Sequence, residues 1–426
     1  MDSGPVGDHA ESAQETAPLP IFYSVKFSEE SRSGGLTMKF ATIRSHGRGK
    51  AAQISNPRRL RAIFAGGTAL AVATAGYMFA PTTSAGAAGA AGSRPEFDSP
   101  SGLAVAGGEL WVTNKRGNSV TEIDPANGSR VATLRGASYG FNRPIAITSA
   151  GSDLFVANRR GSGGSVTEIN PTTGAAVEVI SGSQFQFDKP VAITASGSTL
   201  LVLNQGDTKK DPSALGSITE IDASTGDLIQ VISGSSYAFE DPVALAVSGS
   251  DVFVADNTNS AVTDVVISGG SLESVITGGG LDGPSGIGVS SGYVWVSDSV
   301  SSAATQIDAS TDAVVDTYNN SDGAYGFGSP SVVIGTTSDV YITSPFGSSP
   351  MVTDVDATSG TPYWFECDTN SPDPYFSLLS ALAVDGNYLW VASRSGANNP
   401  YPDAATGSLT EIELSTGAEV LRVPSS

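Results

Sequence analysis

The amino-acid sequence repeats one unit seven times between residue 97 and the C-terminus. A representative unit, residues 144 to 182, reads PIAITSAGSDLFVANRRGSGGSVTEINPTTGAAVEVISG. It holds four short apolar runs, each ended by Gly, Ser, Asn or Pro, which is typical of four antiparallel strands joined by tight turns. A repeat of four strands at this period is typical of a propeller blade.

The seven units share one internal spacing. Their opening residues lie 42 to 52 positions apart and are Pro100, Pro144, Pro190, Pro242, Pro284, Pro330 and Leu379. Eleven positions after each opener stands an aromatic residue or leucine, namely Trp111, Phe155, Leu201, Phe253, Trp295, Tyr341 and Trp390. Because one blade cannot bury both faces of its sheet alone, the blades must pack around a common axis. The sequence therefore predicts an all-β fold, a seven-bladed β-propeller of four-stranded antiparallel blades, over residues 93 to 426.

A segment typical of protein export precedes the repeats. Arg58, Arg59 and Arg61 stand ahead of an apolar run from residue 62 to 80, and small residues with an Ala-x-Ala pattern at 85 to 87 follow. This order predicts a signal helix within residues 57 to 92, and the paired arginines are compatible with twin-arginine export. An uncleaved membrane anchor is the alternative, although the run is rich in Ala, Gly and Thr. We expect an extracellular or cell-envelope location.

Residues 1 to 56 are unusual in front of a signal segment, whose charged region is normally terminal. Met38, followed by Lys39, Arg44, Arg48 and Lys50, is a plausible true start. We expect this leader to be disordered.

Histidine and cysteine are nearly absent from the repeats. His9 and His46 both lie in the leader, and Cys367 is the one cysteine of the chain. This composition excludes an internal disulfide and histidine-based catalysis or metal binding in the exported part. Cys367 lies in the apolar run PYWFEC, which indicates a buried thiol rather than a nucleophile.

Aromatic residues recur in the segments that join one blade to the next, here called inter-blade segments. Three positions before the opener stand Phe97, Phe141, Phe187, Phe239, Phe327 and Phe376, with Leu281 in the remaining unit. Since Phe97 has this place although no blade precedes it, the ring should close between the last strand, AEVLRVPSS, and Phe97. Five positions before the opener stand Tyr139, Phe185, Tyr237 and Tyr325. These four either pack between blades or form an aromatic rim for a sugar or peptide.

The first strand of each unit carries small residues two and four positions after the opener, such as Gly102 and Ala104, because inner strands crowd toward the axis. Only the sixth unit departs, with Val332 and Ile334. No carboxylate, amide or lysine occurs at these positions, whereas a catalytic site in the central channel would need such groups. We therefore expect no cofactor and no catalytic residue.

The second and third strands carry a recognisable pattern. They read ELWVTN, DLFVAN, DVFVAD and YVWVSD, followed by SVTEID, SVTEIN or SITEID. The chain thus resembles the YVTN and NHL classes of β-propeller repeat over all seven units. That resemblance implies the propeller fold but little about function. Streptogramin B lyases are similar in repeat but rely on a histidine, and gluconolactonase-like propellers hold a divalent metal with acidic and amide groups at the channel mouth.

One ring of amide and acidic residues ends the second strands. It comprises Asn114, Asn158, Asn204, Asp256 and Asp298, with Ser344 and Ser393 in the same position. Such side chains usually bond the nearby backbone. We expect that role here and no metal.

Charge is distributed unevenly. The whole chain has a net charge of −21, which disfavours binding to nucleic acid or to anionic lipid. Yet no lysine or arginine occurs between Asp211 and Ser393. In an up-and-down blade, the loop from strand two to strand three and the inter-blade segment emerge on the same side. These connections carry the residues we call the basic crescent, namely Lys115, Arg116, Arg143, Arg159, Arg160, Lys189, Lys209, Lys210 and Arg394.

Two interpretations of the basic crescent remain open. Its charges pair locally with Asp188, Asp207, Asp211 or Glu240, or they bind an anionic envelope polymer or an exported protein. We predict a non-catalytic, monomeric binding scaffold. The alternatives are a metal-assisted hydrolase or lyase and a propeller that oligomerises through its acidic side.

Overall fold

The computed structural model describes the side chains of most of the repeat region. The described residues are 97–159, 163–206, 214–319, 325–345, 351–365, 378–394 and 407–424, together with two short segments, 23–26 and 42–45, near the N-terminus. The chain divides into two compact units, Met1–Pro81 and Thr82–Ser426. Arg160, Lys209, Lys210, Cys367, Phe376 and the predicted signal segment lie outside the described residues.

The first unit contributes one pair of short strands, β1 (Tyr23–Lys26) and β2 (Thr42–Ser45). They pair antiparallel, with Tyr23 opposite Ser45. The sequence predicted no regular structure in this leader. In the part of the chain that the structure describes, no helix reaches the length and apolar character that a membrane crossing requires.

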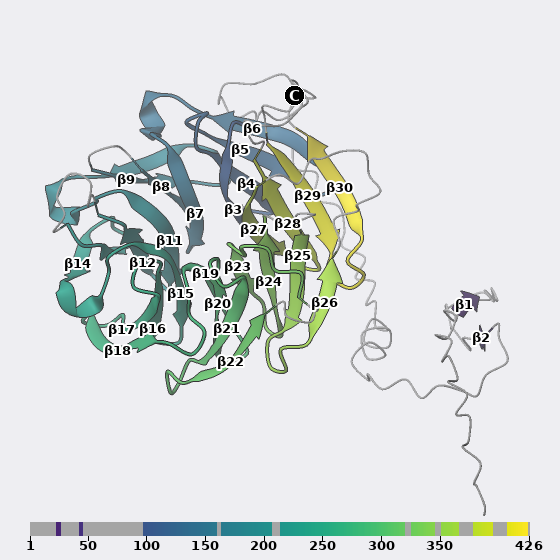
Figure 1. Ribbon diagram of the computed structural model, residues 1–426. Helices are drawn as coiled ribbons and strands as arrows, with labels where there is room; N and C mark the ends of the chain where they lie inside the picture. Colours follow the sequence, from purple (N-terminus) through teal and green to yellow (C-terminus); the bar gives the residue numbers. More distant parts are fainter. Residues whose placement is uncertain are drawn as a thin grey trace, which may run out of the picture. The chain divides into compact units, whose positions relative to one another are not determined.

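The second unit is a propeller of seven four-stranded sheets (Figure 1). In every sheet the four strands pair antiparallel in chain order, from the innermost to the outermost. The first three blades comprise β3 (Pro100–Ala106), β4 (Glu109–Asn114), β5 (Ser119–Asp124), β6 (Ser129–Leu134); β7 (Pro144–Ala150), β8 (Asp153–Asn158), β9 (Ser165–Ile169), β10 (Ala176–Ile180); and β11 (Pro190–Ser196), β12 (Thr199–Asn204), β13 (Ser217–Asp222), β14 (Leu228–Ser233). Short 3-10 helices, η1 (Ala137–Tyr139), η2 (Ser183–Phe185) and η3 (Ser235–Tyr237), lie in the inter-blade segments that lead into blades two, three and four.

The remaining four blades repeat this arrangement. They comprise β15 (Pro242–Ser248), β16 (Asp251–Asp256), β17 (Ala261–Val266), β18 (Ser271–Thr277); β19 (Pro284–Ser290), β20 (Tyr293–Asp298), β21 (Ala303–Asp308), β22 (Val314–Asn319); β23 (Val333–Gly335), β24 (Asp339–Ser344), β25 (Met351–Asp356), β26 (Pro362–Phe365); and β27 (Leu379–Asp385), β28 (Tyr388–Ser393), β29 (Ser408–Glu413), β30 (Glu419–Pro424). The predicted fold is thereby confirmed.

The opening prolines start the innermost strands because proline has no N–H to donate to the sheet. A bulge follows directly, as between Pro100 and Gly102 or between Pro144 and Ala146. Blade six differs from the prediction, since β23 begins at Val333, three residues after Pro330. Its backbone nevertheless stays bonded to β24 through Ser331 and Thr343.

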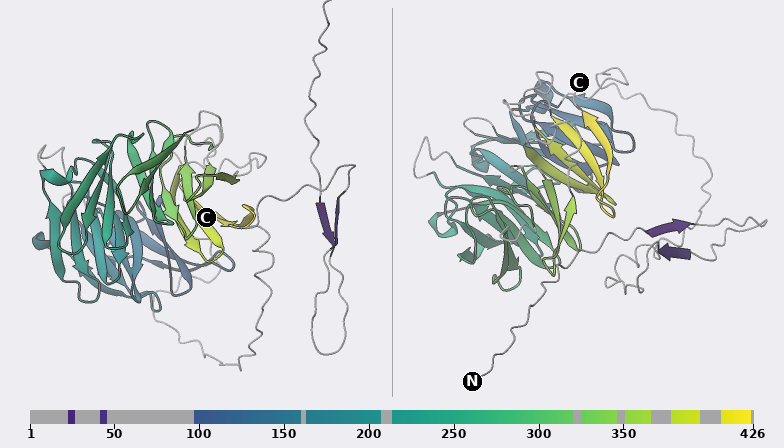
Figure 2. Two further views of the ribbon diagram at one scale, coloured as in Figure 1. Left: turned by 90° about the horizontal axis from the view of Figure 1, so that it is seen from below. Right: turned by 45° about the vertical axis from the view of Figure 1, so that its right-hand side comes forward.

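The ring closes by docking the segment before β3 onto blade seven, as predicted. Phe97 is fully buried among Trp390, Leu409 and Val423 of blade seven and residues of blade one. The amide of Gly407 donates to the Phe97 carbonyl at 2.7 Å. Blade seven forms all four strands from its own residues, and β30 lies beside blade one in Figure 2.

A serine hydroxyl on the innermost strand bonds the neighbouring blade both at the closure and within the ring. The Ser101 hydroxyl donates to the Pro144 carbonyl at 2.9 Å, and the Ser380 hydroxyl donates to the Pro100 carbonyl at 2.9 Å across the closure. The closing interface is therefore built like an internal one.

Small residues on the inner strands are required by the approach of neighbouring blades. A methyl group added at Gly286 would lie 2.1 Å from the carbonyl oxygen of Ser331. Gly→Ala in a strand ordinarily stabilises slightly by restricting the unfolded chain. We expect Gly286→Ala to reverse that sign and lower the free energy of unfolding by about 2 kcal/mol, because backbone must move. Urea unfolding measures the change, and an unchanged or higher stability would contradict the crowding argument.

Candidate functional site: a cationic channel mouth

One backbone hydrogen bond recurs where the second strand of a blade ends. The first residue after that strand donates its N–H to the carbonyl of the residue before the opener, at 2.9 to 3.2 Å. The donors are Arg394, Lys115, Arg159, Gln205, Asn257 and Ser299, in the order of blades seven and one to five. The loop from strand two to strand three and the inter-blade segment therefore emerge on the same face, as predicted. Since the acceptors precede the innermost strands, these donors surround the mouth of the central channel.

Cations occupy three neighbouring positions of this ring, in blades seven, one and two. Lys115 and Arg159 are half-buried, and Arg143 from the inter-blade segment is exposed beside them. Burial, and then the positive fields of Arg394, Arg143 and Arg159, lower the pKa of Lys115 to about 8. Four members of the basic crescent thus act on one another electrostatically, although they come from three blades.

The two guanidinium groups of the ring are held in place. Arg394 donates from Nε to the Pro100 carbonyl at 3.0 Å, which adds a contact across the ring closure. Arg159 donates from a terminal nitrogen to Gln205, and Gln205 in turn donates to Asp241. Burial is the main cause that lowers the pKa of Arg159 and of Arg394. These groups remain cationic at neutral pH, since the ordinary value is far above it.

The other crescent residues lie farther from this centre or outside the described residues. Arg116 is exposed, and its N–H donates to the Asp98 carbonyl at 3.1 Å. Lys189 is half-buried and precedes blade three in a left-handed backbone conformation, with φ +54°. The chain of hydrogen bonds from Arg159 through Gln205 to Asp241 agrees with the first interpretation, local pairing of the crescent with acidic residues.

The four aromatic residues of the expected rim lie between blades. Tyr139, Tyr237 and Tyr325 each stack on the phenylalanine two positions later, with ring centroids 5.1 to 5.6 Å apart, and their hydroxyls donate to glycine carbonyls at 2.6 to 2.9 Å. Phe185 stacks on Phe187 at 5.3 Å. These contacts are the ones that the packing interpretation requires. A ligand-binding role for the four residues stays a prediction.

A buried threonine on the third strand positions each of these aromatic residues. Its hydroxyl donates to the backbone carbonyl of the aromatic residue at 2.7 to 2.8 Å, in the pairs Thr167 with Tyr139, Thr219 with Phe185, Thr263 with Tyr237 and Thr353 with Tyr325. This explains the threonine in the repeated VTEI and ITEI patterns, a role that sequence reasoning missed.

The Asn and Asp ring bonds its surroundings, as predicted. Asn158 donates to the hydroxyl of Thr167 at 2.9 Å and accepts from the backbone N–H of Asn142 at 3.4 Å. Asp298 accepts from the Asp282 N–H at 3.1 Å and from the Thr305 hydroxyl at 2.7 Å. Burial raises the pKa of Asp298 to about 7. Among the described residues, no group of three or more His, Cys, Asp or Glu side chains could hold a metal ion.

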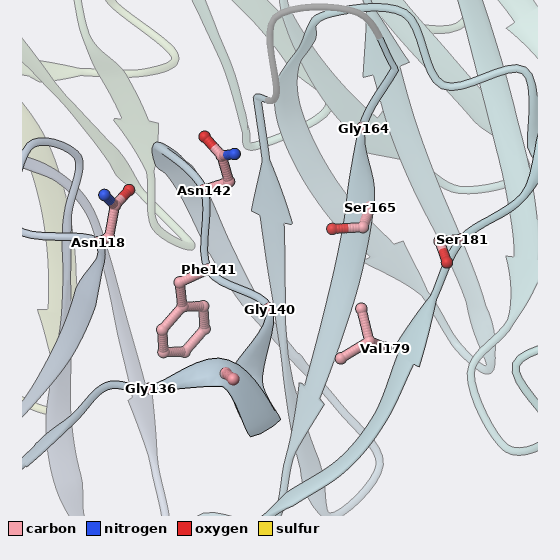
Figure 3. Close-up of a pocket in the computed structure, with 10 residues that line it drawn as sticks. Asn118, Gly136, Gly140, Phe141, Asn142, Gly164, Ser165, Val179 and Ser181 are labelled. Carbon is pink, nitrogen blue, oxygen red and sulfur yellow. The ribbon is translucent and has the colours of Figure 1, made fainter.

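A pocket of about 500 Å³ opens between blades one and two on the crescent face. Its lining combines Asn118 of blade one, the inter-blade segment around Phe141 and Asn142, and Ser165 and Ser181 of blade two (Figure 3). The pocket adjoins the cation cluster, because the Asn118 side-chain oxygen accepts from the Arg143 N–H at 2.7 Å. We call this pocket the first inter-blade groove. Sequence reasoning did not identify it.

Comparison with known proteins was made by sequence and by structure. No protein-family model matches the sequence, and no curated protein matches it. A virginiamycin B lyase from Staphylococcus aureus superposes with a TM-score of 0.52 at 14% identity, over 68% of this chain and 90% of that chain. A streptogramin B lyase superposes with a TM-score of 0.54 at 13% identity, over 70% and 91%. A hydrazine synthase from Kuenenia stuttgartiensis reaches a TM-score of 0.45 at 16% identity, over 64% and 84%. The likeness to the two lyases establishes that this chain has the β-propeller fold of those proteins.

Proposed function

We propose that this protein is an exported, non-catalytic scaffold that binds an anionic polymer of the cell envelope on the crescent face. Its repeats would belong to the YVTN and NHL type, and the apolar segment before them would direct export. The observation that carries the proposal is the convergence of Lys115, Arg143, Arg159 and Arg394 at one channel mouth of a strongly acidic chain.

Clustered cations favour an anionic ligand on energetic grounds. Burial and mutual repulsion disfavour the charged form of Lys115, as the lowered pKa shows. A bound carboxylate or phosphate would relieve that repulsion and form charge-assisted hydrogen bonds with the guanidinium groups. The acidic remainder of the surface would repel the same polymer elsewhere and so direct it to this face.

A binding measurement on the full chain tests the proposal, with polygalacturonate as the polyanionic probe. We expect the double change Lys115→Gln and Arg159→Gln to weaken binding at least about tenfold at low salt, because each lost charge-assisted contact contributes above 1 kcal/mol. Salt-dependent retention on isolated cell envelope should fall in parallel.

The matched control removes two cations from outer strands. Arg130→Gln with Arg422→Gln changes the net charge equally, and both residues lie on outermost strands, β6 and β30, where Arg422 pairs with Glu419 at 2.7 Å. This control should bind within about twofold of the unaltered chain. Equal losses in the two double variants would mean that net charge alone governs binding, and no loss in the first would refute the proposed function.

The lyase or hydrolase alternative shares the fold of the superposed lyases and has no further support from them at this identity. Added divalent metal distinguishes it. A ligand that binds only the native state must raise the melting temperature, so a metal-dependent rise would favour the enzyme.

A further inference from the structure

We propose that the first inter-blade groove holds one or two sugar rings of the anionic polymer, so that the ligand is an acidic polysaccharide rather than an acidic polypeptide. The proposal rests on the proposed function, because the groove adjoins the cation cluster. Three parts of the groove support the proposal, namely a partly exposed aromatic ring, the chemistry of the lining and the charge at one position.

The first part concerns Phe141. In the other described inter-blade segments the equivalent side chain is buried, with an exposed fraction of 0% for Phe97 and Phe239, 3% for Phe327, 6% for Phe187 and 7% for Leu281. Phe141 alone among them stays partly exposed, although Tyr139 stacks on it at 5.1 Å. Figure 3 shows its ring between Asn118 and Gly136 at the groove wall. An aromatic ring left accessible in a pocket offers a surface on which the C–H face of a sugar can stack.

The second part concerns the lining. Gly136, Ala137, Gly140 and Gly164 leave the backbone uncovered, and among the described lining residues Val179 is the one aliphatic side chain larger than alanine. The polar groups of these described residues are uncharged, being the amides of Asn118 and Asn142 and the hydroxyls of Ser165 and Ser181. Amides and hydroxyls both donate and accept, as the hydroxyl groups of a sugar require. An acidic polypeptide offers one backbone N–H donor per residue and carboxylate acceptors, whereas each sugar ring offers several hydroxyl groups that both donate and accept. The volume of about 500 Å³ is ordinary for a small-molecule site.

The third part concerns Asn142, two positions before the opener. The equivalent residues in blades one, three, four and five are Asp98, Asp188, Glu240 and Asp282, all acidic. The second blade alone among these five carries a neutral amide there, beside Arg143 and the groove. Blades six and seven carry Gly328 and Ser377 at this position and so have no carboxylate there either. Beside the groove, a carboxylate at position 142 would repel an anionic sugar.

The test blocks the groove at its rim. Ser181 is exposed, follows β10 and lines the groove, so Ser181→Trp should fill it without disturbing the core. Ser233 has the equivalent position in blade three and is also exposed, and the phenylalanine of the inter-blade segment before blade three, Phe187, is buried. Ser233→Trp is therefore the matched control, and thermal melting of both variants verifies folding.

Affinities of the full chain are measured for an oligogalacturonate of defined length and for polyglutamate, an acidic polypeptide. We expect Ser181→Trp to weaken oligogalacturonate binding at least tenfold and polyglutamate binding less than twofold, with Ser233→Trp changing neither. Asn142→Asp, which introduces the carboxylate that blades one, three, four and five carry at this position, should weaken oligogalacturonate binding at least about threefold while Asn142→Ala has a smaller effect.

Two outcomes would overturn the inference. Equal oligogalacturonate affinities for the two tryptophan variants would show that the groove is not used, and equal losses for both probes in Ser181→Trp would show that it does not select sugars. In either case the Lys115 and Arg159 variants could still lose binding, so failure of the groove and failure of the proposed function are separable.

Discussion

Acidification from pH 8 to pH 5 should stabilise this protein and raise its melting temperature by at least about 5 °C. Two buried carboxyls, Asp264 and Asp298, and the half-buried carboxyl of Glu122 each have a pKa of about 7 in the folded chain. Burial is the largest cause in each case, followed by Glu109 for Glu122 and by Asp312 for Asp264.

The sign follows from linkage between protonation and folding. Unfolded carboxyls titrate near pH 4, so between about pH 4 and 7 the folded chain binds more protons than the unfolded chain. The stability that Glu122, Asp264 and Asp298 contribute is fully present below their unfolded pKa of about 4, and it is lost as the pH rises through 7. Allowing for solvent screening, each carboxyl contributes on the order of 1 kcal/mol, and 1 kcal/mol corresponds to about 2–4 °C in a domain of this kind. Acidification also lowers the net negative charge of the chain, and the weaker repulsion between its charges stabilises the folded state further.

Asp298→Asn tests this explanation at one residue. Blades one to three carry asparagine in the same position, where Asn114 and Asn158 donate to a third-strand threonine at 2.9 Å, and Thr305 stands ready as that partner in blade five. The variant should therefore melt higher than the unaltered chain at pH 8 and equally at pH 5. Asp308→Asn, at the end of β21, is the control without this pattern, because hydrogen bonds from Ser310 lower the pKa of Asp308. A pH-independent melting temperature in the unaltered chain would contradict the prediction.

Phe97→Ala should lower the free energy of unfolding by about 3–5 kcal/mol, the usual cost of truncating a fully buried phenylalanine. The buried ring of Phe97 belongs to the cluster that joins blade seven to blade one. Each of these two blades forms its four strands from its own residues, so no shared strand holds the propeller closed. Loss of the ring leaves a cavity at the one interface whose two blades are not consecutive in the chain.

Phe141→Ala is the comparison, because the equivalent ring there is partly exposed and its two blades are consecutive. Urea unfolding should show a clearly smaller loss for Phe141→Ala. Equal losses of unfolding free energy would mean that the closing interface depends on Phe97 no more than an internal interface depends on its equivalent phenylalanine.

Sequence reasoning identified part of the candidate site. The spacing of the repeats predicted that Lys115, Arg143, Arg159 and Arg394 would share one face, because strand order decides on which side each connection emerges, and the backbone bonds of these loops agree. The first inter-blade groove was missed. An alignment of the first five units would have shown one signal, since Asn142 stands where the other four carry an acidic residue. The accessibility of Phe141, by contrast, depends on how two blades meet.

The number of blades, their closure at Phe97 and the face of each loop were determined by the sequence alone, because period and strand alternation are properties of chain order. Tertiary structure alone decided which aromatic residues are covered and which carboxyls hold their protons. Both depend on the distance and burial that arise where neighbouring blades pack, as at Asp264 beside Asp312 of the next blade. Asp264 and Asp312 are 48 positions apart in the chain, so no local pattern of the sequence records their contact.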